Sequence, residues 1–107
     1  MVFLETPIFT KQIKSLISDE EYAKLQMELF RRPQQAPVIR KSGGIRKLRW
    51  AVEGSGKSGG VRVLYYVITE SGQIYMLLAF KKGDQENITA EQLAVLRNVV
   101  LEELNNG

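Results

Sequence analysis

Cations in the middle of the chain are the residues with the clearest capacity for chemistry. Lys47 and Arg49 stand two positions apart, Arg62 follows a glycine-rich segment, and Lys81 and Lys82 end the next apolar run. Residues two apart share one face of a β-strand, so Lys47 and Arg49 should project together. Lysine and arginine neutralise phosphates, and an arginine can hold two phosphate oxygens at once. This pattern predicts a surface that meets a phosphate-rich ligand.

The composition restricts what such a surface can catalyse. The chain contains no histidine and no cysteine. Disulfides, thiolate chemistry, Ser-His triads and the commonest metal ligands are therefore excluded. Proton transfer must use Lys, Arg, Tyr, Asp, Glu or Ser. The net charge is only +3, yet the segment from Arg40 to Arg62 contains seven basic residues and one acidic residue. We expect this part of the chain to contact a negative partner.

Residues that flank the central cations extend the predicted surface. Unpaired RNA is bound where cations meet aromatic side chains on which bases stack. The additional candidates for RNA contact are Arg46, Lys57, Phe80 and Lys81. Basic residues also occur on sheets simply as a solvated face, and this remains the alternative. We expect Trp50 and the tyrosines of the strands to pack in or beside the core.

Two other patterns do not support a nucleotide or metal site. The sequence from Gly54 to Ser58 resembles part of a phosphate-binding loop, but Ala51 stands where the first glycine is required and a strand follows instead of a helix. The predicted sheet offers only Glu53 and Glu70 as carboxylates. We therefore expect no metal and no cofactor.

The elements that position these residues can be read from caps and periodicity. Thr6 followed by proline predicts a helix over residues 7–16. Ser18 begins a capping box for a second helix that ends at Arg32, before a proline. Another capping box at Thr89 starts a last helix with one apolar face.

Three runs rich in β-branched and aromatic residues lie between the second and last helices. Residues 45–53, 61–69 and 73–81 are separated by glycine-containing turns and predict antiparallel strands. Residues 2–5 form a brief extended start. We expect an α+β fold, in which two N-terminal helices and one C-terminal helix pack on an antiparallel sheet, and a single domain over residues 1–107.

The chain has the composition of an ordinary globular protein, with 44% hydrophobic and 25% charged residues. No apolar run approaches the roughly 20 residues that cross a bilayer. The N-terminus lacks the pattern of a secretory signal. We therefore expect a cytoplasmic protein that does not associate with membranes.

The order of elements and the sequence of residues 43–83 resemble the RelE/HigB toxins of bacterial type II toxin-antitoxin modules, in particular a HigB-like branch. The resemblance rests on the combination of "IRKLR", "GGVRVLYYV" and "YMLLAFKK" in the family's order and spacing. It implies a RelE-like fold and a metal-independent endoribonuclease that cuts mRNA on the ribosome and so inhibits translation. It also implies that the 2′-hydroxyl attacks the adjacent phosphate.

The resemblance also implies roles for four residues. Lys47 and Arg49 are similar to the paired basic residues of the catalytic strand, and Arg62 to the arginine that stabilises the phosphate. Lys82 falls where some members carry a second arginine. Residues 86–88 lack the tyrosine found near the last helix of some members, so the group that accepts the proton stays open. Lys47, crowded by other cations, is our candidate.

Partners follow from the same resemblance. A cognate antitoxin with a helix-turn-helix domain, the ribosome and mRNA are expected partners, and DNA only indirectly through the antitoxin. Two alternatives remain. One is a ParE-like toxin that binds DNA gyrase, although such relatives generally lack the full basic set. The other is a module that binds RNA without cutting it.

Overall fold

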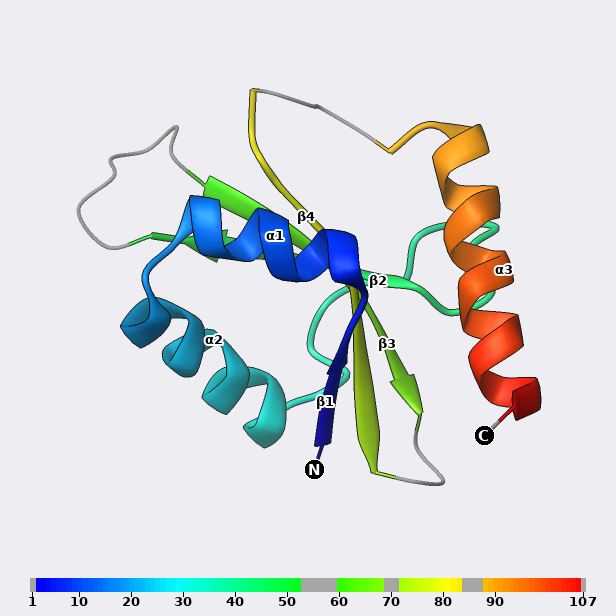
Figure 1. The fold of residues 1–107 in the computed structure, drawn as a ribbon, viewed down its shortest axis with the longest axis horizontal. Coiled ribbons are helices and arrows are strands. Elements are labelled where there is room, and N and C mark those ends of the chain that lie inside the picture. Colours follow the sequence, from blue (N-terminus) through cyan, green and yellow to red (C-terminus); the bar gives the residue numbers. More distant parts are fainter. Residues whose placement is uncertain (1, 53–59, 69–71, 84–87, 107) are drawn as a thin grey trace.

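The computed structural model describes residues 2–52, 60–68, 72–83 and 88–106, and its order of elements is the predicted one (Figure 1). The elements are β1 (Val2–Glu5), α1 (Pro7–Leu16), α2 (Asp19–Arg31), β2 (Arg46–Ala51), β3 (Gly60–Ile68), β4 (Gln73–Lys81) and α3 (Ala90–Asn106). The predicted α+β fold is thus confirmed. None of the helices in these ranges combines the length and apolarity needed to cross a membrane.

The four strands form one sheet in the order β1-β4-β3-β2. The β2–β3 and β3–β4 pairs are antiparallel, as predicted. β1 pairs with β4 in parallel, so the sheet is mixed and not purely antiparallel. Two helices and two strands separate β1 from β4 along the chain, so no tight turn forces these neighbours to run in opposite directions.

Side-chain caps fix the start of each helix where the sequence predicts it. The Thr6 hydroxyl accepts the backbone N–H of Phe9 at 3.1 Å and donates to the carbonyl of Leu77 at 2.9 Å, which ties α1 to β4. The Ser18 hydroxyl accepts the N–H of Glu21 at 3.1 Å. Thr89 caps α3 in the same way. These bonds satisfy amides that the first helical turn leaves unpaired.

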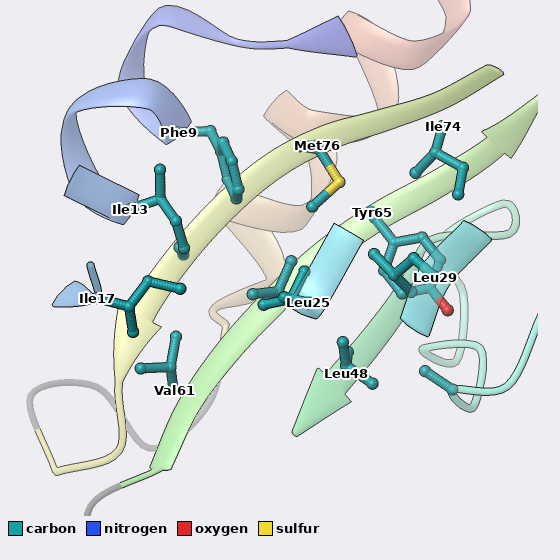
Figure 2. Packing of buried hydrophobic residues seen from close by; sticks show 13 residues of the cluster. Phe9, Ile13, Ile17, Leu25, Leu29, Leu48, Val61, Tyr65, Ile74 and Met76 are labelled. Carbon is teal, nitrogen blue, oxygen red and sulfur yellow. The ribbon is translucent and has the colours of Figure 1, made fainter. Parts of the chain in front are cut away.

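One face of the sheet is covered by α1 and α2. Phe9 and Ile13 of α1 and Leu25 of α2 belong to one buried cluster with the strand residues Tyr65 and Met76 (Figure 2). All five side chains are at most 2% exposed. Fully burying an apolar side chain of this size contributes roughly 1.5–3 kcal/mol, so this layer holds the sheet rigidly on that side.

The opposite face is covered in part by α3. Leu96 and Val100 of α3 pack with Leu64 of β3 and with Leu77 and Phe80 of β4. Leu77 joins this layer because β4 carries an extra residue at this point of its pairing with β3. The spacing of Leu93, Leu96, Val100 and Leu104 predicts one apolar face along α3. Leu104 is 43% exposed, so the buried part of this face ends before it.

The segment between α2 and β2 lies along the outer edge of β2. The backbone N–H of Lys47 donates to the carbonyl of Pro37 at 3.1 Å, and that of Ile39 to the carbonyl of Ile45 at 2.7 Å. The buried Ser42 hydroxyl donates to the Ile39 carbonyl at 2.6 Å and accepts the Ile45 N–H at 2.9 Å. The basic strand is therefore held from both sides, by β3 and by this segment.

Candidate nucleic-acid interface

Three side chains form a row across three neighbouring strands. Arg49 of β2 lies directly opposite Arg62 of β3, and Arg62 lies directly opposite Phe80 of β4. The neighbours of Arg62 in sequence, Val61 and Val63, belong to the core under α1 and α2. Because side chains alternate along a strand, the row lies on the other face, the one that α3 partly covers. The predicted pairing of the two basic strands thus brings Arg49 and Arg62 together.

Two lysines extend this row. Lys47 lies two residues before Arg49, on the same face of β2, and is opposite Leu64, which is part of the α3 layer. Lys82 directly follows β4, and its backbone N–H donates to the carbonyl of Gly60 at 2.9 Å. This hydrogen bond holds Lys82 beside the first residue of β3, two positions before Arg62. We call Lys47, Arg49, Arg62 and Lys82 the cationic face.

Nothing in the described ranges neutralises the cationic face. Arg49 and Lys82 are exposed, and Lys47 and Arg62 are half-buried. Among the residues that the structure describes, none of these four side chains forms an ion pair with a carboxylate. Like charges directly opposite each other in a sheet are destabilising. A sheet that keeps an Arg–Arg pair in this position has a surface suited to an anion.

The four additional residues predicted from the sequence to contact RNA do not all lie on the cationic face. The Arg46 guanidinium donates to the carbonyls of Gln34 at 3.1 Å and Ala36 at 2.6 Å, so it anchors the segment before β2. Alternation along β2 places Arg46 on the face opposite Lys47. We therefore leave Arg46 out of the candidate interface.

Phe80 and Lys81 also lie in positions that differ from those expected for RNA contact at the cationic face. Phe80 is only 7% exposed because α3 covers it, and a ring buried in this way has no free face on which a base can stack. Lys81 is exposed but lies opposite Val61, on the α1 and α2 side of the sheet. Lys57 lies outside the described residues.

The tyrosines of β3 and β4 are packing residues, as the sequence predicts. Tyr65 is fully buried, its hydroxyl donates to the carbonyl of Pro33 at 2.8 Å, and burial raises its pKa. Burial also raises the pKa of Tyr75, with a further contribution from the charges of Glu103 and Glu102 on α3. Tyr66 is half-buried against Gly44, where a Cβ atom would lie 3.0 Å from its ring. The raised pKa values of Tyr65 and Tyr75 favour their neutral forms, so these two phenols are not ready proton acceptors.

One residue of the site was not identified from the sequence. Gly60 precedes Arg62 by two positions in β3, so the two residues share a face, and the Arg62 guanidinium lies over Gly60. The sequence does contain a pattern that could have indicated this residue, namely a glycine two positions before a candidate cation in the same predicted strand region. In the described part of the chain, no cluster of three or more acidic residues is arranged to hold a metal ion.

The fold and the cationic face together define a small α+β protein whose sheet presents a row of cations beside a C-terminal helix. The sequence matches, over residues 1–105, the family described as the RelE toxin of the RelE/RelB toxin-antitoxin system. The chain belongs to this family and is the toxin of a toxin-antitoxin module. Membership implies an antitoxin as its partner.

Proposed function

We propose that this toxin is a ribosome-dependent mRNA endoribonuclease that stops translation in the cytoplasm, and that residues 1–107 form its single domain. The observation that carries the proposal is the row of Arg49 opposite Arg62, with Lys47 and Lys82 beside it and with no carboxylate partner in the described ranges. This arrangement suits a phosphodiester, whose charge increases in the transition state of cleavage. The dependence on the ribosome rests on the family resemblance of residues 43–83.

In the proposed reaction, the 2′-oxygen of a ribose attacks the adjacent phosphorus in line. The 2′-hydroxyl loses its proton, the P–O5′ bond breaks, and the 5′-oxygen receives a proton as it leaves. The products are a 2′,3′-cyclic phosphate and a free 5′-hydroxyl. No water and no redox partner enters this step. The protein has to move protons and to stabilise the negative charge on the phosphate oxygens.

The residues of the cationic face divide this work. In this proposal, Arg62 and Arg49 bind the non-bridging oxygens of one phosphate, since each guanidinium can donate two parallel hydrogen bonds. Lys82 contributes a point charge at the same end of β3. Lys47, two residues before Arg49 on the same face of β2, is our candidate for the group that accepts the 2′-hydroxyl proton. No histidine is required for this assignment, and the chain contains none.

We further propose that the antitoxin carries a helix-turn-helix domain, so that the toxin reaches DNA only through its partner. An acidic antitoxin segment over the cationic face, or an antitoxin elsewhere that blocks binding to the ribosome, would each inhibit the toxin. Complementary charge favours a negative segment at this face at low ionic strength.

The decisive experiment compares cleavage of a defined mRNA in a reconstituted translation system, with and without ribosomes. We expect the unmodified toxin to cut only translated mRNA, and the Arg49→Ala, Arg62→Ala double variant to lose this activity. A control variant, Arg31→Ala with Arg32→Ala, removes the same charge from the exposed end of α2. This control should cut like the unmodified toxin.

The other functions give different results in the same experiment. Intact mRNA under active translation, together with inhibition of DNA supercoiling by gyrase, would identify a ParE-like toxin. Binding of RNA without any cut would identify a non-catalytic module. Cleavage that persists in the Arg49→Ala, Arg62→Ala variant would remove the cationic face from the mechanism.

A further inference from the structure

Gly60 occupies an unusual position for a glycine, because nothing in its backbone requires one. Its φ angle is not among the positive values found at Gly43, Gly44, Gly72 and Gly83. It is paired with Ala51 of β2 in the regular antiparallel register. Glycine in such a position weakens a strand, because it loses more conformational freedom on folding than other residues and has no side chain to pack. A paired strand glycine therefore points to a group that approaches its backbone closely.

That group is the guanidinium of Arg62. A Cβ atom built on Gly60 would lie 2.7 Å from an Nη atom of Arg62 and 3.8 Å from its Cζ. Real Cβ atoms essentially never approach another heavy atom to 2.7 Å. The end of the Arg62 side chain thus lies back along its own strand, in the space that a side chain at Gly60 would fill.

The surface beneath this guanidinium is fixed on both sides. The Trp50 carbonyl oxygen of β2 lies 3.7 Å from the same Cβ position. On the other side, the Gly60 carbonyl accepts the backbone N–H of Lys82 at 2.9 Å. Gly60 is therefore held between β2 and the end of β4, and it cannot move away to admit both a Cβ atom and the guanidinium.

We propose that Gly60 is a positioning residue for phosphate recognition, because its missing side chain leaves the space that the Arg62 guanidinium occupies. The proposal rests on the proposed function, in which Arg62 contacts the phosphate that is cut. Any side chain at position 60 displaces the end of the Arg62 side chain, since a flexible arginine yields more easily than a paired backbone. Gly60 acts through Arg62 and does not itself contact the substrate.

The test is the variant Gly60→Ala, with Gly60→Ser as a second variant that carries the same Cβ atom. The backbone of Gly60 accepts either residue, so both variants should fold and unfold thermally at a temperature equal to or above that of the unmodified protein. We expect kcat for ribosome-dependent cleavage to fall by about tenfold to a hundredfold, the scale for misplacing a catalytic group. KM should stay within about twofold, because binding to the ribosome does not depend on the position of this side chain.

Two further measurements separate positioning from a general structural effect. In the Arg62→Ala background, Gly60→Ala should cause no additional loss of cleavage, because the two residues act through one interaction. The Arg62 side chain is also observed directly by its Nε–Hε NMR signal, assigned by its disappearance in Arg62→Lys. We expect Gly60→Ala to shift this signal and to leave the corresponding signal of Arg31 in place.

The outcomes distinguish the two proposals. A shifted Arg62 signal in a protein that never cuts mRNA would leave the placement by Gly60 intact and refute the proposed function. An unshifted Arg62 signal overturns the positioning proposal, whatever the activity. Unchanged kcat in a folded Gly60→Ala variant with a shifted signal also overturns it, because the position of Arg62 would then have no effect on catalysis.

Discussion

Replacing Arg62 by glutamine should lower the activity without lowering the stability of the fold. Arg62 is half-buried and lies directly opposite Arg49, which is exposed. Loss of one preorganised charge contact to the reacting phosphate costs about 2–4 kcal/mol of transition-state stabilisation. At about 1.36 kcal/mol for each factor of ten, kcat/KM should fall roughly 30- to 900-fold.

The same substitution removes the repulsion between two like charges. Opposed like charges in a sheet cost about 0.2–1 kcal/mol, and solvent around Arg49 reduces this toward the lower end. Glutamine keeps part of the aliphatic stem of Arg62. The free energy of unfolding of Arg62→Gln should therefore equal that of the unmodified protein or exceed it by up to about 0.5 kcal/mol.

The assay combines cleavage of translated mRNA with urea unfolding followed by circular dichroism. The matched control is Arg31→Gln, which removes an arginine that pairs with Glu28 at 3.7 Å on the exposed side of α2. This control should keep full cleavage activity. A decrease of more than about 1 kcal/mol in the unfolding free energy of Arg62→Gln would show that Arg62 is structural, and undiminished cleavage would show that it does not act on the phosphate.

Three other predictions concern the scaffold. Thr6→Ala removes the cap of α1 and the hydrogen bond to the Leu77 carbonyl, so the unfolding free energy should fall by about 2–3 kcal/mol. Thr6→Ser keeps the hydroxyl and should retain most of the stability. Equal losses for the two variants in urea unfolding would contradict this. Tyr65→Phe leaves the Pro33 carbonyl without its donor, and differential scanning calorimetry should show a loss of about 1–2 kcal/mol; an unchanged stability would show that water replaces the phenol. Burial raises the pKa of Tyr65 and Tyr75 above their ordinary value of 10.0, so the neutral phenols stabilise the fold fully below that pH and progressively less as the pH rises above it. Urea midpoints measured across the alkaline range should stay level up to about pH 9 and then decrease, and a decrease that begins near neutrality would refute this, since the chain has no histidine to titrate there.

Local signals in the sequence predict most of the elements because each has a local physical cause. The Thr6 and Ser18 caps are decided by residues within one helical turn, and both occur as predicted. Strand alternation places Lys47 and Arg49 on one face for the same reason. The adjacency of the two basic strands also follows from the sequence, since consecutive antiparallel strands usually lie side by side. The register that sets Arg49 opposite Arg62 is known only from the structure.

Long-range packing decides the features that the sequence does not reveal. Phe80 is buried because α3 folds back over the end of β4, and no residue near Phe80 in the chain reports this. Arg46 is turned away from the cationic face by alternation, and its binding to Gln34 and Ala36 depends on the path of an irregular segment. The parallel pairing of β1 depends equally on contacts between distant parts of the chain.

Gly60 shows a third kind of limit. A glycine that ends a glycine-rich segment reads as part of a turn, and its role appears only when the Arg62 side chain is placed over it. The spacing of two residues was visible, but the rotamer of Arg62 was not.

The central claim is tested most directly on a purified ribosome complex with a defined codon of the mRNA in the A site. Primer extension after addition of the toxin maps any cut to a nucleotide. We predict a cut within the A-site codon, with a 2′,3′-cyclic phosphate on the upstream fragment, and no cut by the Arg49→Ala, Arg62→Ala variant. Intact mRNA in the presence of excess folded toxin, or an equal cut by the variant, would contradict the account.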